Sequence, residues 1–461
     1  ILASFLVNSD IRKKIKKIKK DKKKFDLKNS DKVIKKLNFK LTNDQKKTLI
    51  EINNDLTSKS KMFRLLQGDV GSGKTIVSLI SALNVVNSGY QVALMAPTEI
   101  LARQHFVLAK KIFPTQINLA LLSSKSENKI KKEIIDNLKT KKIDMVFGTH
   151  AIFQKKITFS NLGFIIIDEQ HKFGVRQRKL LSDKGGKNCD VLLMSATPIP
   201  RTLTMSIYGD MDISIIREKP NNRKEVKTYS KLESKIEDVI NFVKKEIYEG
   251  NQIFWVCPLI EVSKKLDHES AVKKFEYLNK IFPNKVALLH GKIENDEKEK
   301  ILNKFLEKKF LILVSTTIIE VGIDFPNANV IIIENSNKFG LSQLHQLRGR
   351  VGRGNKQASC ILMFKSNLTE NAKKRINILK NSNDGFDISE EDMKLRGFGD
   401  ILGFKQSGLK NFKLADPVHN ENLFKLAETE IKNIENNNLD IDKYKTLLKL
   451  YDQADIINDI V

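Results

Sequence analysis

Short apolar runs alternate with longer amphipathic stretches along the first half of the chain. Between residues 62 and 215 the apolar runs are Met62–Leu66, Val92–Ala96, Met145–Phe147, Phe164–Ile167 and Val191–Met194. Most of them are followed at once by a polar or glycine-containing segment. This alternation predicts an α/β domain with a parallel sheet, in which ligands bind at the carboxyl ends of the strands.

A second series of apolar runs has the same organisation. Its members are Ile253–Val256, Val286–Leu289, Phe310–Val314, Val330–Ile333 and Cys360–Phe364. The polar stretch 219–224 separates the two series, and beyond about residue 370 helical patterns dominate. We therefore expect two similar α/β domains in tandem, with a cleft between them, followed by a helical region.

The first apolar run leads into a glycine-rich loop, residues 68–75, with the sequence Gly-Asp-Val-Gly-Ser-Gly-Lys-Thr. In such a loop the glycines let backbone N–H groups turn toward phosphates, the lysine reaches the β- and γ-phosphates and the threonine holds Mg²⁺. A helix expected over 76–86 completes the required order of strand, loop and helix. Taken alone, the loop has an ordinary glycine turn as its alternative. The predicted ATP-binding residues of the loop are Gly68, Gly71, Ser72, Gly73, Lys74 and Thr75.

Two adjacent carboxylates, Asp168 and Glu169, directly follow the four apolar residues 164–167. Asp168 is predicted to hold Mg²⁺, directly or through water, and Glu169 to polarise the attacking water. A surface acidic pair is the alternative, but such a pair is not expected directly after a buried strand. Together with the glycine-rich loop, the pair predicts an enzyme that hydrolyses ATP with Mg²⁺.

Arginines alternate with glycines in the segment 346–353 of the second series. Arg350 and Arg353 are predicted to reach the γ-phosphate as arginine fingers, and a basic surface loop is the alternative. Lys74, Asp168 and Glu169 complete the predicted catalytic set.

Small polar residues follow strands in both series. Ser195 and Thr197 are candidates for sensing the γ-phosphate, and Thr316 and Thr317 for coupling the nucleotide state to a nucleic-acid track. For Ser195 and Thr197 the alternative is an unremarkable turn, and for Thr316 and Thr317 it is strand-end capping.

The charge of the chain favours a polyanionic partner such as nucleic acid, because 81 Lys and Arg residues outnumber 55 Asp and Glu residues for a net charge of +26. The abundance of lysine, asparagine and isoleucine offers a compositional alternative. Residues 11–25 hold ten basic side chains and one acidic one, with isoleucines at helical spacing. They predict a basic amphipathic helix that either contacts a nucleic-acid backbone or links domains, or else presents a solvated face.

Three cysteines, Cys189, Cys257 and Cys360, are too far apart for a zinc site and too few for a disulfide framework, so buried or incidental thiols in a reducing cytoplasm are expected. No apolar run approaches the roughly 18 residues of a membrane span, and the apolar start of the chain is too short for a signal peptide. A soluble cytoplasmic protein is therefore predicted.

The motifs together resemble those of superfamily 2 helicases. Residues 67–75, 168–171 and 194–201 are similar to the first three motifs of that superfamily, and 315–327 and 346–354 to later ones. The segment with Phe39, Leu41, Thr42 and Gln45 resembles its adenine-contacting segment, in which Gln45 would read the base. The residues that resemble its DNA-tracking motifs are Pro97, Thr98, Gly148 and Thr149; strand-end capping is again the alternative.

A narrower resemblance, to the RecG family, rests on the segments 255–261, 382–386 and 395–408. The last is similar to the translocation motif that this family shares with the transcription-repair coupling factor, in which a helical hairpin and loop convert cleft closure into movement on duplex DNA. By this match Arg396 and Gln406 are candidate functional residues. Phe398 and Asp400 stand where the family usually has proline and glutamate, a departure that bears on the stiffness of the loop.

The resemblance implies two tandem RecA-like parallel-sheet domains with a C-terminal helical hairpin region. The expected ranges are a basic helical linker at 1–40, an ATP-binding domain at 41–218, a second helicase domain at 225–370 and the translocation-motif region at 371–461. The family's N-terminal wedge domain has no counterpart here, and a start at Ile1 leads us to expect a fragment of a longer protein.

The activity that the resemblance implies is that of an ATP-dependent DNA helicase or translocase acting on branched duplex DNA, such as stalled forks and Holliday junctions, in recombination and repair. A monomer is expected, with single-strand-binding protein as a further partner. The motor of the coupling factor is the nearest alternative, which the segment at Trp255 disfavours. An RNA helicase is disfavoured by the sequence Asp-Glu-Gln-His at 168–171, and a truncated DNA-binding remnant without coupled activity by the intact catalytic residues.

Overall fold

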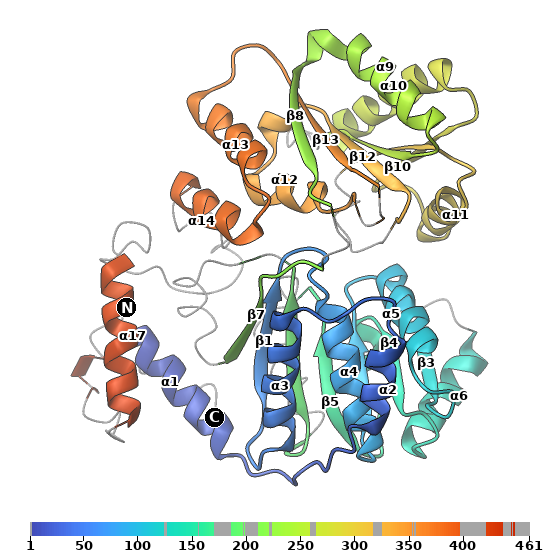
Figure 1. Cartoon of the computed structure of the whole chain (residues 1–461). Helices are drawn as coiled ribbons and strands as arrows, with labels where there is room; N and C mark the ends of the chain where they lie inside the picture. The colour runs from blue at the N-terminus through green and yellow to red at the C-terminus, as the bar shows by residue number, and fades with distance from the viewer. Residues whose placement is uncertain are drawn as a thin grey trace. The chain divides into compact units, whose positions relative to one another are not determined.

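The computed structural model of the chain describes residues 2–123, 127–154, 156–169, 186–196, 198, 211–220, 224–258, 264–316, 325–352, 354, 356–396, 421–436, 444 and 446–447. Its contacts divide the chain into two compact units (Figure 1). The first contains Ile1–Glu218 together with Met393–Val461, and the second contains Lys219–Asp392. Residues 1–40 are thus grouped with the first sheet and residues 371–392 with the second.

The first unit is built on a seven-stranded sheet in which every strand pair is parallel, in the order β3-β4-β2-β5-β6-β1-β7. The predicted α/β fold is therefore confirmed for this half. The two edge strands, β3 and β7, were not predicted. Strand β3 is an apolar run of four residues of which only alternate ones are buried, and the apolar residues of β7 are interrupted by Ser214. The strands are β1 (Phe63–Gly68), β2 (Gln91–Met95), β3 (Leu119–Leu122), β4 (Met145–Gly148), β5 (Leu162–Ile167), β6 (Asp190–Ser195) and β7 (Asp212–Ile216).

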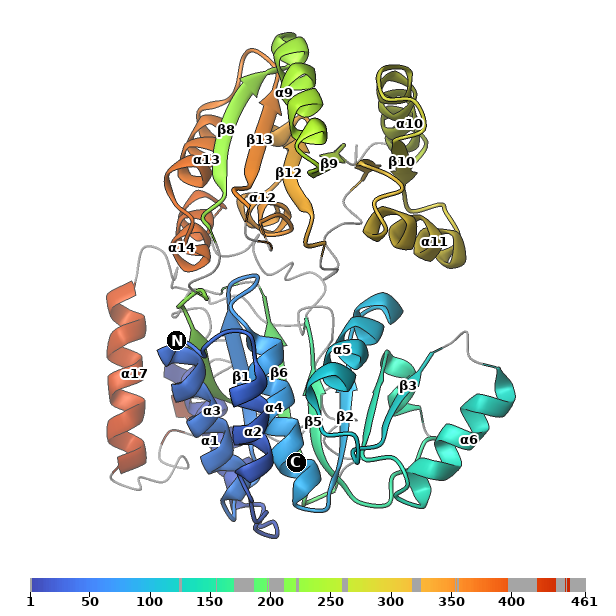
Figure 2. The same ribbon diagram turned by 45° about the vertical axis from the view of Figure 1, so that its right-hand side comes forward.

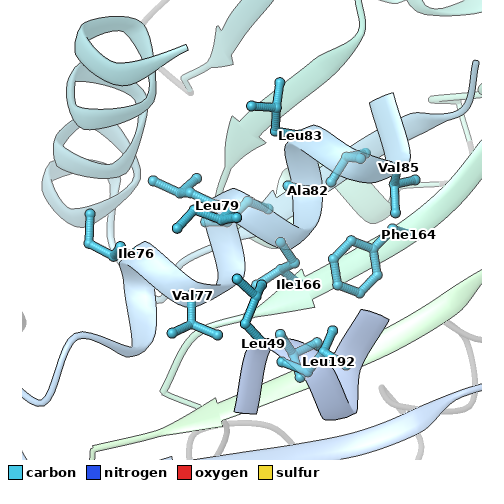
Figure 3. Close-up of a cluster of buried hydrophobic side chains, with 14 of the residues drawn as sticks. Leu49, Ile76, Val77, Leu79, Ala82, Leu83, Val85, Phe164, Ile166 and Leu192 are labelled. Carbon is cyan, nitrogen blue, oxygen red and sulfur yellow. The ribbon is translucent and has the colours of Figure 1, made fainter. Parts of the chain in front are cut away.

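Helix α4 (Lys74–Asn87) is buried over nearly its whole length. Figure 3 shows its side chains, among them Val77 and Leu79, beside Ile166 of β5 and Leu192 of β6 in one apolar cluster. Each such side chain contributes about 1.5–3 kcal/mol of hydrophobic stabilisation when fully buried. The amino end of α4, which receives the glycine-rich loop, is therefore held firmly against the sheet. The other helical elements between β-strands or before them are α2 (Lys28–Lys36), α3 (Asn43–Thr57), α5 (Glu99–Ile112), α6 (Asn128–Lys139) and the 3₁₀ turn η1 (His150–Phe153).

The second unit repeats the design with a six-stranded parallel sheet, in the order β10-β11-β9-β12-β13-β8. Five of its strands coincide with the predicted second series. Edge strand β8 was missed because its sequence, Lys-Thr-Tyr-Ser-Lys-Leu, is polar and largely exposed. The strands are β8 (Lys227–Leu232), β9 (Gln252–Val256), β10 (Val286–Leu289), β11 (Ile312–Ser315), β12 (Ala328–Ile333) and β13 (Ser359–Phe364).

Helices cover both faces of this second sheet. Figure 2 shows α9 and α10 on one side and α12 and α13 on the other. The core under α9 and α10 contains Trp255 of β9, whose side chain is fully buried. The helical elements are η3 (Glu233–Lys235), α9 (Ile236–Tyr248), α10 (Lys264–Ile281), α11 (Asn295–Leu306), η5 (Ser336–Lys338), α12 (Leu341–Arg348), α13 (Glu370–Asn381) and α14 (Gly385–Arg396).

The C-terminal part of the chain is helical wherever it is described in elements, as the sequence predicted. Helix α17 (Glu421–Asn436) packs beside α1 (Leu2–Lys17) within the first unit, where the rings of Phe5 and Phe424 lie 6.2 Å apart. Most of the segment predicted to form the translocation loop, including Phe398, Asp400 and Gln406, lies outside the described residues. Within the described residues, no helix has the length and apolar character that crossing a membrane requires.

The basic segment near the N-terminus departs from its prediction. Helix α1 ends at Lys17, and the chain continues without helix through residues 18–26. The ammonium groups of Lys20 and Lys23 lie 2.7 Å and 2.6 Å from the carboxylate of Asp190, and all three side chains are fully buried. Burial lowers the pKa of Lys20, and the nearby carboxylate offsets only part of that effect. The expectation of a continuous helix is therefore wrong past Lys17, and a solvated face is excluded for these two lysines.

Replacing Asp190 with alanine is expected to lower the free energy of unfolding by about 3–5 kcal/mol, because it leaves two buried ammonium groups without a counter-charge. The matched control is Asp212→Ala, which removes an exposed pair with Lys16 and is expected to cost about 0–1 kcal/mol. Chemical denaturation of the two variants gives the comparison. Equal losses would show that the buried cluster contributes no more than a surface pair.

The three cysteines are buried free thiols, as predicted. Burial raises the pKa of Cys189 and of Cys360 to about 12. Such thiols are protonated at neutral pH and are poor nucleophiles or metal ligands, so no role in the chemistry is assigned to them.

Candidate nucleotide and magnesium site

The glycine-rich loop joins β1 to α4 with the geometry that phosphate binding requires. Gly71 and Gly73 have φ angles of 77° and 87°, in the left-handed region that glycine adopts without strain. A Cβ atom on Gly73 would collide with the amide of Gln45. The loop therefore accepts only glycine at this position without rearrangement.

Polar groups of this loop face inward. The ammonium group of Lys74 donates to the carbonyl oxygens of Gly68 and Asp69, at 2.7 Å and 2.9 Å. The hydroxyl of Ser72 is buried and forms no hydrogen bond with the described residues. A buried hydroxyl and ammonium beside backbone N–H groups at a helix amino end are suited to an anion such as a nucleotide phosphate. The residues present thus fit ATP.

Asp168 directly follows β5, and three of its atoms form hydrogen bonds. Its backbone N–H donates to Met95 O at 2.9 Å, its Oδ1 accepts the N–H of Glu169 at 2.9 Å, and its Oδ2 lies 2.8 Å from Nε2 of His105. Burial opposes ionisation of Asp168. Its pKa is nevertheless lowered, because the carboxylate is stabilised by the hydrogen bond and charge of His105, by the charge of Lys74 and by the N–H of Glu169. Because Asp168 is therefore a carboxylate, Nε2 of His105 must be the donor. An oriented carboxylate near Lys74 fits Mg²⁺, which binds proteins through one or two carboxylates together with substrate phosphates.

Glu169 adopts a φ angle of 54°, which is uncommon outside glycine. Such conformations are concentrated at functional sites, where the surrounding structure holds them in place. The backbone therefore leaves the extended conformation of β5 at Glu169.

Gln45 connects the predicted adenine-contacting segment to the glycine-rich loop. Its Oε1 accepts the N–H of Thr42 at 3.0 Å as part of a capping box at the start of α3, and its Nε2 donates to Ser72 O at 2.7 Å. Phe39 packs as a half-buried side chain against the core of the first unit. The structure thus gives Gln45 a role in positioning the phosphate loop, in addition to the predicted reading of the base.

The same end of α3 is joined to Arg217 and Glu218, directly after β7, by two carboxylates that each accept hydrogen bonds from the other's segment. Oε2 of Glu218 accepts the N–H groups of Asn43 and Asp44, at 2.7 Å and 3.3 Å. Oδ2 of Asp44 accepts the N–H groups of Arg217 and Glu218, at 2.8 Å and 2.9 Å. Because β7 ends at Ile216, which pairs with Gly68, this contact lies next to the phosphate loop.

Asp44→Ala and Glu218→Ala are each expected to lower the free energy of unfolding by about 1 kcal/mol, the typical loss when a helix cap is removed. The loss of stability in the double variant is expected to be smaller than the sum of the two single losses, by at least about 0.5 kcal/mol. Either single replacement already loosens the shared contact. Urea denaturation measures all three. As a control, Asp144→Ala removes a distant cap on Asn118 and should add to Asp44→Ala without coupling. Simple additivity of Asp44 and Glu218 would contradict the reciprocal contact.

The predicted DNA-tracking residues lie at the carboxyl ends of β2 and β4. Thr98 is the N-cap of α5, and its hydroxyl accepts the N–H of Leu101 at 3.4 Å. A Cβ atom on Gly148 would lie 2.7 Å from Leu122 O, so close strand packing requires glycine there. Thr98 thus has the capping role given as the alternative, and Gly148 has a packing role that was not predicted; both are compatible with contact to DNA.

In the second unit, α12 carries the first arginine of the arginine-glycine segment. Arg348 is buried and donates to Leu379 O and Ser382 O, at 2.6 Å and 2.9 Å, at the end of α13. Arg348 therefore holds two helices together. Arg350 follows α12, with its N–H donating to Leu347 O at 3.0 Å.

The structure places most predicted site residues at the carboxyl edges of the two sheets. In the first unit these are Gly68, Lys74, Thr75, Pro97, Thr98, Gly148, Thr149, Asp168, Glu169 and Ser195, and in the second Thr316. Thr197, Thr317, Arg353 and Gln406 lie outside the described residues, and of Arg396 only the backbone, at the end of α14, is described. Sequence reasoning missed His105, Asp44, Glu218 and the structural role of Arg348. The spacing of Leu101, Ala102, His105 and Ala109, all buried on α5, could have indicated that His105 faces the sheet.

Family models define the class of protein. The model described as DEAD/DEAH box helicase matches residues 42–206, and the helicase conserved C-terminal domain matches residues 234–355. The solved structure of Mss116p bound to ssRNA and AMP-PNP shares the fold, with a TM-score of 0.60 at 19% identity over 80% of each chain. The fold and the two matched domains are thus those of a superfamily 2 helicase.

The C-terminal region and the relatives narrow the assignment. The model described as ATP-dependent DNA helicase RecG, domain 3, C-terminal, matches residues 382–453. The RecG proteins of Bacillus subtilis (strain 168) and Thermotoga maritima are each 47% identical to this chain, over 87% and 90% of its length. The structure of RecG bound to a three-way DNA junction is 44% identical over 92% of this chain, with a TM-score of 0.76. The chain belongs to the RecG family. It spans 59% and 53% of those two relatives and 55% of the solved RecG chain.

Proposed function

We propose that this chain is the motor portion of an ATP-dependent DNA helicase or translocase that acts on branched duplex DNA. The observation that carries the proposal is the glycine-rich loop with Lys74 near Asp168 and Glu169 at one sheet edge, in a chain 44% identical to a RecG bound to a three-way junction. In the whole protein, the substrates would be stalled forks and Holliday junctions during recombination and repair. The match to the C-terminal RecG model favours this function over that of a coupling-factor motor.

The catalytic roles follow from the chemistry of each group. Lys74 and the loop N–H groups would bind the β- and γ-phosphates. Thr75 and Asp168 would hold Mg²⁺, which would supply positive charge beside the phosphates. Glu169 orients and deprotonates the attacking water. Arg350 and Arg353 stabilise the charge on the transferred phosphoryl group as arginine fingers.

Coupling of hydrolysis to movement is assigned to residues at the strand ends of both units and in the C-terminal region. Phe39 and Gln45 would bind the adenine. The coupling residues would be Pro97, Thr98, Gly148, Thr149, Ser195, Thr197, Thr316, Thr317, Arg396 and Gln406. The linker would comprise residues 1–40, the two helicase domains residues 41–218 and 225–370, and the translocation region residues 371–461.

The partners in this account are duplex and branched DNA, with single-strand-binding protein as a further partner, and the protein acts as a monomer in the cytoplasm. Binding to a three-way junction or plain duplex is expected to weaken steeply with salt, because each phosphate neutralised by lysine or arginine contributes about −0.9 to the slope of log K against log salt. Fluorescence anisotropy between low and physiological salt measures this slope. A flat response would show that the net charge of +26 reflects composition and that DNA is not the partner.

A further inference from the structure

Asp168 is contacted twice by the same β2–α5 segment. Its backbone N–H donates to Met95 O on the last residue of β2, at 2.9 Å, and its Oδ2 accepts from Nε2 of His105 on α5, at 2.8 Å. The turn between these contact points contains Pro97 and Thr98. The turn predicted to contact DNA is therefore bracketed by two hydrogen bonds to Asp168, one from its backbone N–H and one to the carboxylate predicted to hold Mg²⁺.

Helix α5 is a stiff connection between the turn and His105. It begins after Thr98, whose hydroxyl caps it, and His105 lies two turns further along, on the face that also buries Leu101 and Ala109. Movement of the capped end is therefore expected to move His105 with it.

A buried imidazole on this face needs a specific reason. The other buried positions of α5 are the apolar residues Leu101, Ala102 and Ala109, whereas His105 is 5% exposed. Burying a polar side chain is unfavourable unless it is hydrogen-bonded. The partner that satisfies His105 is an active-site carboxylate and not a backbone carbonyl of its own helix.

We propose that His105 is a positioning residue through which the Pro97–Thr98 turn sets the orientation of the Asp168 carboxylate. The inference rests on the proposed function and adds to it a route by which DNA at the amino end of α5 controls the metal-binding carboxylate. With the hydrogen bond in place, Oδ2 is fixed and the carboxylate keeps one rotamer. Without it, Asp168 is held only through its backbone and the N–H of Glu169.

The test compares His105→Gln with His105→Asn in the full chain. The glutamine amide nitrogen reaches the position of Nε2 and can donate to Asp168, whereas the asparagine amide is one methylene too short. The two variants are otherwise similar in polarity. Val107→Ala, at an exposed position on the same helix, is the matched control.

The first readout is binding of a fluorescent ADP analogue as a function of Mg²⁺ concentration. His105→Asn is expected to raise the Mg²⁺ midpoint about 10- to 100-fold, the usual loss when the partner of a metal-ligating side chain is removed. Nucleotide affinity in EDTA should not change. The second readout is the ratio of DNA-stimulated to basal ATP hydrolysis, which should fall for His105→Asn, while His105→Gln and Val107→Ala stay near wild type.

The outcomes separate the inference from the proposed function. A His105→Asn variant with a wild-type Mg²⁺ midpoint and wild-type DNA stimulation overturns the inference, even when its melting temperature is lower. If His105→Asn does not fold, His105→Gln provides the test. A wild-type Mg²⁺ midpoint in this variant supports positioning by a hydrogen-bond donor, and a shift of the midpoint of tenfold or more overturns it. A wild-type chain that binds nucleotide without any dependence on Mg²⁺ and hydrolyses none overturns the proposed function, and the role of His105 with it.

Discussion

Replacing Arg350 with alanine is expected to lower the rate of ATP hydrolysis by about 10³- to 10⁵-fold, the range found for arginine fingers. The guanidinium group would neutralise charge that develops on the γ-phosphate only in the transition state. Nucleotide affinity should therefore change much less than kcat. Steady-state hydrolysis and binding of a fluorescent nucleotide give the two values. Arg350→Lys is expected to restore little, because lysine lacks the planar, two-pronged donor geometry of arginine.

Arg348→Ala is the control within the same segment, with a different expected result. Because Arg348 donates to Leu379 O and Ser382 O, its removal leaves buried carbonyls without a donor, at a cost of about 1–3 kcal/mol in stability. Its main effect should thus appear in thermal or chemical unfolding. Hydrolysis within tenfold of wild type for Arg350→Ala would remove Arg350 from the catalytic set.

Glu169→Gln is expected to keep nucleotide and DNA binding and to lose at least about 100-fold in turnover, because the amide cannot accept the proton of the attacking water. Asp168→Asn should differ by also weakening the Mg²⁺-dependent part of nucleotide binding. Glu133→Gln, an exposed position on α6, is the surface control. Single-turnover hydrolysis after saturation with ATP measures the chemical step. Normal turnover in Glu169→Gln would exclude Glu169 as the base.

The parts of the fold that the sequence predicted are those whose signal is local. The β5 strand is a continuous apolar run because both faces of a central parallel strand are buried. The phosphate loop is recognisable because its chemistry needs closely spaced glycines followed by lysine and threonine. Strand β8 could not be predicted, because a largely exposed edge strand with lysines at its first and fifth positions resembles a polar linker. Its place in the sheet depends on pairing with β13, far along the chain.

The contacts of single residues were also hard to predict, because they join positions far apart in the sequence. The burial of Lys20 and Lys23 was not predicted, because it depends on partners distant in sequence: the Asp190 carboxylate and the carbonyl oxygens of Asp55, Leu56 and Asn188. His105 meets Asp168 across 63 positions of sequence, a contact that helical spacing can suggest but not identify. Gln45 was predicted from its motif to read the base, whereas its contact with Ser72 O depends on how the start of α3 packs against the phosphate loop.

We expect ATP hydrolysis by this chain to be coupled to duplex DNA. The most direct measurement is the ATPase rate of the chain without DNA and with single-stranded, duplex and four-way-junction DNA. We expect duplex or junction DNA to raise the rate well above the rate without DNA. If none of these DNAs changes the ATPase rate, hydrolysis by this chain is not coupled to DNA.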